Sequence, residues 1–235
     1  MKILVIPDSH LKPFIFMKAD EILNNQMADR AVCLMDIPDD WGKIWSLEVY
    51  DEMYWTVLSF ARKHPDTYWC LGNHDCSYLW KRMETGYSAA AAYLVKEKTE
   101  ELIHTAGEDH VSFARRIDSL VFSHGGLAKS FMNDCFSQEE QRKIDHCIER
   151  INAMGAEDLW IQDSPIWARL QPGYDMPAFT TRGMTQVVGH TPVEEVQEYN
   201  RVITTDVFST YRDGSPIGNQ KMIIIDSETA EWVYA

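Results

Sequence analysis

Basic side chains are scarce in this chain of 235 residues. The 22 lysines and arginines are outnumbered by 36 aspartates and glutamates, which gives a formal net charge of −14. Such a surface repels polyphosphate backbones unless a local basic patch or bound cations reverse the field. We therefore do not expect nucleic acid as a general partner. Clustered carboxylates also suit hard cations, although most of this charge belongs on a solvated surface, where it favours solubility.

Closely spaced cysteine pairs and long hydrophobic runs are also lacking. The five cysteines include no Cys-x-x-Cys pair, and an odd, scattered set in a chain of this size argues against a disulfide framework. The apolar run at the N-terminus meets Pro7-Asp8 too early for a signal peptide, and no later run approaches membrane-spanning length. We therefore predict a cytoplasmic protein with no membrane partner. The length suits one domain over residues 1–235 with a sizeable core.

Three polar side chains of chemical interest follow a short apolar run at 68–71. The run ends at Gly72, and Asn73, His74 and Asp75 come next. An amide oxygen can complete the shell of a divalent cation, and an imidazole one residue later can face a substrate and donate a proton. Taken alone, the motif fits an ordinary turn better, because Gly and Asn favour left-handed backbone and Asp caps helices.

The same arrangement recurs along the chain, and this changes the interpretation. The predicted strands and the polar residues after them are 3–6 with Asp8 and His10, 30–34 with Asp36, 68–71 with Asn73, 119–122 with His124, and 185–188 with His190. Open α/β sheets place their sites at the carboxyl ends of strands. Each pairing has a plain alternative as a polar turn or helix cap. Independent turns would rarely agree so well, so we expect a metal site.

The remaining pattern predicts how these strands are connected. Helices are predicted at 14–27, 47–63 and 88–106, and the strand–helix–strand order implies parallel pairing with right-handed crossovers. Residues 111–115 and 119–122 are predicted to pair about a turn near Asp118. Four short strands, at 195–199, 201–205, 221–226 and 231–234, suggest an antiparallel end to a second sheet.

A helical and loop insertion is predicted at about 127–184. A capping box at 137–140 begins a helix that reaches about Met154. Prolines and glycines punctuate 164–184, which predicts a long irregular loop facing the substrate. Arg169 and Arg182 lie in this loop, and surface arginines usually have no specific role.

Taken in order, these motifs resemble the calcineurin-like metallophosphoesterases. That family's ordered signature is Asp-x-His, Gly-Asp-x-x-Asp, Gly-Asn-His-Asp/Glu, a His in a Ser-His-Gly-Gly-like turn, and Gly-His-Thr. The chain meets these motifs in order at Asp8/His10, Asp36/Asp39, Gly72 to Asp75, His124 and Gly189-His190-Thr191, and the match extends from residue 3 to about residue 206. The closest similarity is to the phage and bacterial protein-phosphatase and diadenosine-tetraphosphatase branch, whose Gly-His-Thr-Pro is also followed by a strand with an Asp, here Asp206. The resemblance implies an α/β fold, a four-layer α/β/β/α sandwich of two mixed β-sheets flanked by helices.

The resemblance also implies the ligands of two metal ions. Asp8, His10 and Asp36 would hold the first, and Asp36, Asn73, His124 and His190 the second. Two cations about 3.5–4 Å apart need a shared carboxylate, here Asp36, and can share a hydroxide that attacks phosphorus. His74, oriented by Asp75 or Asp39, would protonate the leaving oxygen. Mn²⁺ is the first expectation, with Fe or Zn²⁺ as alternatives, because the site mixes imidazole and oxygen ligands.

Two departures from the family pattern stand out. Met35 occupies the position of the glycine before the bridging Asp, and Asp40-Trp41 replaces the arginine with which this branch binds phosphate. Arg169, in a Trp-x-Arg motif like that of the branch, is the better substitute, and we favour it over Arg182.

The expected function is hydrolysis of phosphomonoesters or related phosphoesters, with a phosphoprotein (Ser/Thr) or a dinucleoside polyphosphate as the phosphorylated substrate. A catalytically weak or silent metal-binding scaffold of the same fold is the alternative, motivated by Met35 and the lost arginine. A Ser or Cys hydrolase is a third interpretation, because Ser123, Cys70 and Cys76 lie near the motifs, but no nucleophile elbow accompanies them. The sequence does not determine an oligomeric state.

Overall fold

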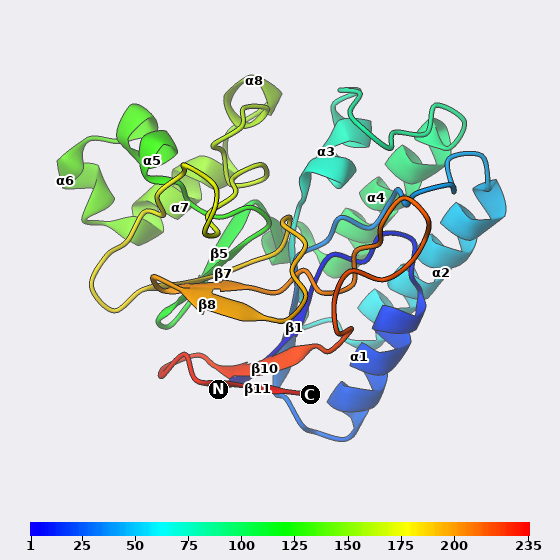
Figure 1. Cartoon of the computed structure of the whole chain (residues 1–235), viewed down its shortest axis with the longest axis horizontal. Helices are drawn as coiled ribbons and strands as arrows, with labels where there is room; N and C mark the ends of the chain where they lie inside the picture. Colours follow the sequence, from blue (N-terminus) through cyan, green and yellow to red (C-terminus); the bar gives the residue numbers. More distant parts are fainter.

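Two mixed β-sheets form the centre of the computed structural model, which describes residues 1–235 (Figure 1). The first sheet has the strand order β11-β10-β1-β2-β3-β4, and the second has the order β5-β6-β7-β9-β8. The strands are β1 (Lys2–Ile6), β2 (Arg30–Cys33), β3 (Tyr68–Cys70), β4 (Val111–Ser112), β5 (Ala114–Ile117), β6 (Leu120–Ser123), β7 (Thr185–Val188), β8 (Gln197–Tyr199), β9 (Val202–Thr204), β10 (Ile223–Asp226) and β11 (Trp232–Tyr234).

Helices flank both sheets, which confirms the predicted α/β class. They are α1 (Phe14–Asn24), α2 (Leu47–Lys63), α3 (Asn73–Leu79), α4 (Ala92–Ala106), the 3₁₀ helix η1 (Glu108–His110), α5 (Lys129–Cys135), α6 (Gln138–Gln141), α7 (Ile144–Asn152) and α8 (Ala156–Leu159). In Figure 1, α1, α2 and α4 lie on one side of the molecule and α5 to α8 on the other. No helix is both long and apolar enough to cross a membrane.

Aliphatic and aromatic side chains form the core around the parallel strands β1, β2 and β3. The aliphatic strand β1 is buried from Ile3 to Ile6, and it pairs in parallel with β2, which pairs in parallel with β3. Phe16 of α1 and Phe60 of α2 place their rings 6.0 and 6.2 Å from the ring of Trp69 in β3. Burying each such side chain contributes about 1.5–3 kcal/mol. This packing holds the ends of the three strands, and therefore the residues after them, in register.

The second sheet supplies two more strand ends. β6 and β7 pair in parallel, with Leu120 opposite Thr185, and His124 and Gly189 follow these two strands directly. The backbone N–H of Gly189 donates to the carbonyl of His124 at 2.8 Å. The two histidine-bearing turns are therefore adjacent although they are far apart in sequence.

One predicted strand is divided between the sheets. The strand expected at 111–115 breaks at Phe113, so that β4 pairs with β3 in the first sheet while β5 pairs with β6 in the second. The side chain of Asn152 bridges the crossing: its Oδ1 accepts from the backbone N–H groups of Phe113 and Ala114 at 2.9 and 3.0 Å. These bonds satisfy two backbone N–H groups at the point where the chain passes from one sheet to the other.

The predicted placement of the C-terminal strands is partly wrong. β8 and β9 do pair antiparallel in the second sheet, but β10 and β11 join the first sheet, where β10 pairs antiparallel with β1. Ile223, Ile224 and Ile225 of β10 are all buried. Three consecutive buried aliphatic residues need cover on both faces of the sheet, and the position of β10 between β1 and β11 provides it.

The segment 127–184 contains four short helices and then an irregular stretch. The single helix predicted from 137 to about 154 is in fact α6 and α7, with α6 ending at Gln141 and α7 beginning at Ile144. The predicted capping box is present, because Ser137 Oγ accepts from the backbone N–H of Glu140. The chain between Trp160 and Met184 has no regular element, as its prolines and glycines indicate.

Candidate metal centre

The carboxyl ends of β1, β2, β3, β6 and β7 bring the predicted ligands together. Five of them are at most 6% exposed, namely Asp8, Asp36, Asn73, His124 and His190, and His10 is half-buried. Ionised groups are rarely buried unless they are paired or bind a cation. Positive charge at the centre of the cluster would therefore stabilise the buried carboxylates of Asp8 and Asp36.

His124 lies in the middle of the cluster. Its Nε2 atom is 3.0 Å from Asp36 Oδ2, 3.0 Å from Asn73 Oδ1 and 3.2 Å from His190 Nδ1. Its Nδ1 atom donates to the carbonyl of Leu34 at 2.9 Å. This bond directs Nε2 into the cluster, as a hydrogen bond from the other ring nitrogen does for histidines that bind metals. Burial lowers its pKa, but the charges of Asp36 and Asp8 outweigh burial and raise the pKa of His124 to about 10. A proton or a metal cation can supply the charge that these carboxylates require.

Two groups of potential ligand atoms share one residue. The ligand atoms of His10, Asp36 and His74 lie within 4.8 Å of one another, and so do those of Asp36, His124 and His190. Nδ1 of His10 donates to the carbonyl of Asp39 at 2.9 Å, which leaves Nε2 of His10 for the cluster. Asp36, which both groups share, therefore lies where the bridging carboxylate is predicted. His74 is predicted only as a proton donor, but one of its ring nitrogens lies within 4.8 Å of ligand atoms of His10 and Asp36.

Asp8 belongs to neither of these groups, but its environment suits a cation. Its Oδ2 atom accepts from the backbone N–H of His190 at 2.8 Å and lies 3.9 Å from His124 Nε2. Its Oδ1 atom is buried without a hydrogen-bond partner, as is His190 Nε2. Burial, followed by the charge of Asp206, raises the pKa of Asp8. Asp8 Oδ1 and His190 Nε2 are thus free to bind a metal ion. One oxygen and one nitrogen fit the mixed ligand set of a transition-metal ion.

Two glycines press directly against the ligand carboxylates. A Cβ atom on Gly72 would lie 2.0 Å from Asp36 Oδ1, and one on Gly189 would lie 1.9 Å from Asp8 Oδ1. No side chain can be accommodated at such distances. The glycines of the Gly-Asn-His-Asp and Gly-His-Thr-Pro motifs are therefore required for space.

The loop after β2 is strained, and Asp75 holds it. Met35, at the glycine position of the family pattern, has a φ of 57°, and Asp36 has a φ of 42°. Such left-handed conformations are costly for non-glycine residues, and they cluster at functional sites. Asp75 accepts from the backbone N–H groups of Asp36 and Ile37 at 2.8 and 3.1 Å. Asp75 thus supports the backbone of the ligand loop and does not contact the ring of His74.

Asp39 is the carboxylate that orients His74. Nδ1 of His74 lies 2.8 Å from Asp39 Oδ2, and Asp39 Oδ1 accepts from the hydroxyl groups of Tyr50 and Tyr78. Burial lowers the pKa of His74, but the charge of Asp36 and the hydrogen bond to Asp39 raise it to about 10. Of the two predicted orienting residues, only Asp39 is in place to act on the ring.

Glu84 is not among the residues predicted from the sequence, but it contacts two residues of the Gly-Asn-His-Asp motif. Its Oε2 atom accepts from Asn73 Nδ2 at 2.7 Å, and its Oε1 atom is 3.7 Å from His74 Nδ1. Because the amide nitrogen of Asn73 donates to Glu84, its amide oxygen faces His124. Glu84 lies in an irregular segment after α3 with no motif around it, so no local signal could have found it.

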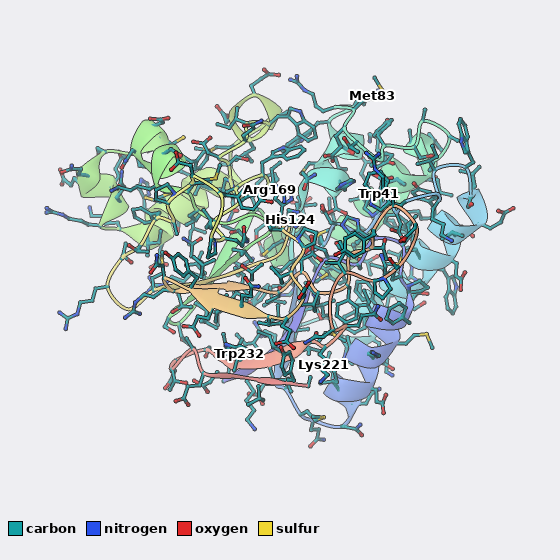
Figure 2. The ribbon with its side chains drawn as sticks, viewed as in Figure 1. Trp41, Met83, His124, Arg169, Lys221 and Trp232 are labelled. Atoms are coloured by element: carbon teal, nitrogen blue, oxygen red, sulfur yellow. The ribbon has the colours of Figure 1, made fainter.

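The structure distinguishes the two candidate arginines. Nη1 of Arg169 donates to the carbonyl of His190 at 3.0 Å and to Thr191 Oγ1 at 3.2 Å. Arg169 and His124, both labelled in Figure 2, each contact His190. Arg182 is exposed and has no such contact. The structure therefore brings Arg169, and not Arg182, to the ligand turn.

The alternative nucleophiles are not activated. Burial raises the pKa of Cys70 to about 12 and also raises that of Cys76, so neither thiol is ionised at neutral pH. Ser123 Oγ is buried without a hydrogen-bond partner, so no base is placed to remove its proton. All five cysteines are free.

Comparison with known families agrees with this geometry. A sequence model described as calcineurin-like phosphoesterase matches residues 1–212. The chain belongs to this family. The phosphoesterase is therefore a member of a hydrolase family that typically binds two metal ions and acts on phosphoesters. No match was found among curated proteins.

Solved structures share the fold of this phosphoesterase at low sequence identity. A cold-active protein-tyrosine phosphatase of a psychrophilic Shewanella species has 16% identity and a TM-score of 0.57, over 99% of this chain and 80% of that chain. Another structure of a cold-active protein tyrosine phosphatase has 16% identity and a TM-score of 0.58, over 99% and 78% of the two chains.

Proposed function

We propose that this phosphoesterase hydrolyses phosphomonoesters or related phosphoesters with two bound metal ions, and that His74 is the general acid. The supporting observation is the pair formed by His74 and Asp39 at 2.8 Å, next to the buried ligand cluster. Asp8, His10 and Asp36 would hold one ion, and Asp36, Asn73, His124 and His190 the other. When bound, the ions supply positive charge to the phosphate group and activate water for attack.

The residues around His74 prepare it to give up a proton at a defined atom. Because Nδ1 of His74 is bound to Asp39, the free ring atom is Nε2. The ring of His74 packs edge-on against His10 with centroids 5.2 Å apart, which keeps it beside the ligands. With a pKa raised by Asp36 and Asp39, His74 is protonated at neutral pH. It can therefore protonate an alkoxide or phosphate leaving oxygen, which departs poorly as an anion.

Arg169 is the proposed phosphate-binding residue. Its guanidinium is held by the carbonyl of His190 and by Thr191, so its remaining donors can reach a substrate oxygen with little loss of side-chain freedom. It takes the place of the arginine that Asp40-Trp41 replaces.

The finer assignment is to the protein-phosphatase and diadenosine-tetraphosphatase branch, supported by Gly189-His190-Thr191-Pro192 and by Asp206 after β9. The substrate would be a phosphoprotein or a dinucleoside polyphosphate. Manganese as the bound ion, one domain with an insertion at 127–184 and a cytoplasmic location stay predictions.

The test is hydrolysis of phenyl phosphate, whose leaving oxygen departs poorly without a proton, with added Mn²⁺ by the wild-type, Asp36→Asn and His74→Ala proteins. We expect turnover by the wild type and a loss of at least about 100-fold in each variant, since general acid catalysis alone contributes about 10²–10⁴-fold. Activity that survives both substitutions would contradict the proposal. Two bound metal equivalents without turnover across a broad phosphoester panel would instead favour the silent scaffold.

A further inference from the structure

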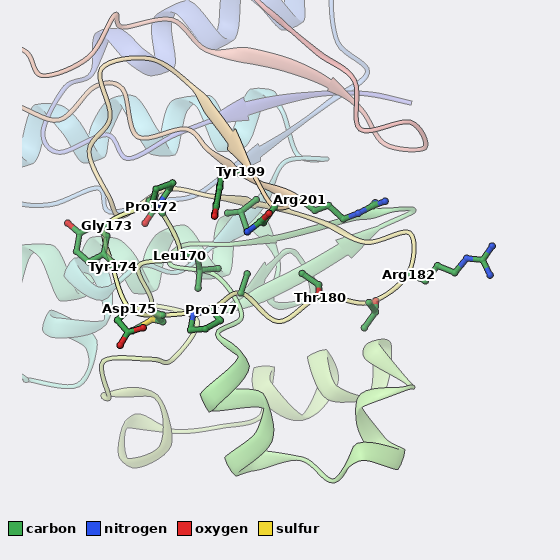
Figure 3. Close-up of a pocket in the computed structure, with 16 residues that line it drawn as sticks. Leu170, Pro172, Gly173, Tyr174, Asp175, Pro177, Thr180, Arg182, Tyr199 and Arg201 are labelled. Carbon is green, nitrogen blue, oxygen red and sulfur yellow. The ribbon is translucent and has the colours of Figure 1, made fainter.

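A cavity of about 880 Å³ lies between the loop at 170–182 and the β8–β9 turn at 199–202 (Figure 3). Its size is in the range of ligand-binding sites. Arg169 immediately precedes the first cavity residue and donates to the carbonyl of His190. The ring of Tyr174, in the cavity wall, lies 5.7 Å from the same guanidinium. A substrate whose phosphate meets Arg169 can therefore extend its leaving group into this cavity.

The cavity contains a buried polar atom that lacks a partner. Gln171, which lines the cavity, is 6% exposed, and its Nε2 atom donates to Thr204 Oγ1 at 3.1 Å. Its Oε1 atom has no hydrogen-bond partner. A buried carbonyl oxygen without a hydrogen-bond donor is destabilising, because it has lost its hydrogen bonds to water and gained none. An N–H group of a ligand in the cavity would satisfy it.

The edge of the second sheet borders the same cavity. β8 pairs only with β9, and all three of its residues are exposed. Its outer backbone edge is therefore free to pair with an extended chain, which is a common way of binding peptides. Tyr199, the last residue of β8, lines the cavity and is 51% exposed.

The charge of the cavity differs between its two ends. Arg201 and Arg182 lie at the end opposite Tyr174 and Asp175, and Arg182 points outward (Figure 3). The arginines that form ion pairs in this structure are Arg62, Arg82, Arg116 and Arg150. Arg201 and Arg182 thus present unpaired positive charge in a chain whose net charge is −14, and this selects for an anionic group.

We propose that this cavity is a subsite for the peptide part of a phosphopeptide substrate, with Gln171 accepting a peptide N–H and Arg201 recognising an acidic side chain. The inference rests on the proposed function, because it concerns what is attached to the phosphate that the metal centre hydrolyses. A nucleoside is the competing occupant, because a base could stack on the exposed ring of Tyr199. The free edge of β8 favours the peptide, because only an extended chain can pair with a strand edge.

The experiment compares substrates that do and do not reach the cavity. Steady-state kinetics would be measured with p-nitrophenyl phosphate, with phosphoserine peptides carrying one Glu walked along either side of the phosphoserine, with their Glu→Gln counterparts, and with diadenosine tetraphosphate. We expect one Glu position to lower KM by about fivefold, as an exposed ion pair at the upper end of its range would. Arg201→Ala should abolish that preference, and Gln171→Leu should raise KM for every peptide. Both variants should leave the kinetics with p-nitrophenyl phosphate unchanged.

Arg142→Ala is the matched control, because Arg142 is exposed and lies outside the cavity. It removes the same charge and should not alter the Glu preference. The subsite is wrong if Glu and Gln peptides have equal KM values at every position, or if Arg201→Ala affects only diadenosine tetraphosphate. Absence of p-nitrophenyl phosphate hydrolysis would instead refute the proposed function, so the two failures are distinguishable.

Discussion

Asp39 joins the ring of His74 to the hydroxyl of Tyr50: its Oδ2 atom lies 2.8 Å from His74 Nδ1, and its Oδ1 atom accepts from Tyr50 at 2.8 Å. Tyr50 lies in α2, and Tyr78 in α3 bonds the same oxygen. The orientation of the proposed acid is thus set by two helices that flank the first sheet.

Asp39→Asn should lower kcat by about 10–100-fold and do so more for alkyl than for aryl phosphates. The amide no longer stabilises a protonated ring, and substrates with poor leaving groups depend most on proton donation. The measurement is kcat/KM against leaving-group pKa for the two proteins. Equal losses for all leaving groups would show that Asp39 does not act through His74.

Activity should persist to alkaline pH and then fall. The pKa of His74 is raised from 6.5 to about 10, so the acid form is present across neutral pH and is lost as the pH approaches the raised value. The raised pKa also stabilises the fold, and this contribution is fully present below pH 6.5 and is lost as the pH rises toward 10. In Asp39→Asn the alkaline fall in kcat/KM should move to lower pH. An unmoved fall in the pH profile would assign it to another group.

Gly72→Ala and Gly189→Ala should each weaken metal binding by about 10–100-fold, the range seen when groups that support metal ligands are altered. The added Cβ atoms would lie 2.0 and 1.9 Å from the carboxylates of Asp36 and Asp8, which must move away. Elemental analysis after dialysis measures the effect. Gly155→Ala is the control, because nothing lies within 4 Å of its added Cβ and its φ is −105°; it should keep full metal content.

Glu84→Ala should weaken metal binding, whereas Glu84→Gln should restore much of it. Glu84 accepts from Asn73 Nδ2 at 2.7 Å, and a glutamine carbonyl can accept the same bond, so the amide oxygen of Asn73 would stay directed at the cluster. Titration of the apo-protein with Mn²⁺ tests this. If both variants bind metal as the wild type does, Asn73 needs no such support.

Arg169→Ala should weaken inhibition by inorganic phosphate by about tenfold, since a charge-assisted hydrogen bond contributes about 1.5–3 kcal/mol. Arg182→Ala should leave this inhibition constant unchanged, because Arg182 is exposed and makes no contact with the ligand turn. Competition against p-nitrophenyl phosphate provides both constants. Equal effects of the two substitutions would argue for a general charge effect.

Local patterns were enough to find the strand ends. The aliphatic run of β1 and the apolar run of β3 are each followed at once by polar motifs, and a buried strand has to end where such residues begin. The positions of Asp8, Asp36 and Asn73 could therefore be predicted, and the resemblance supplied an order that connected them. The α/β class followed from the same alternation of strands and helices.

What only the tertiary structure decided are the contacts between segments with no sequence relation. Glu84 meets Asn73 from an irregular segment, and Asp75 binds backbone N–H groups of Asp36 and Ile37 instead of its neighbour His74. β10 pairs beside β1 although it comes near the end of the chain. The pattern of apolar residues that marks a strand, and the residue types of a motif, occupy consecutive positions in the sequence. Which distant group satisfies a buried amide, carboxylate or strand edge depends on how the whole core packs, and that information is not local.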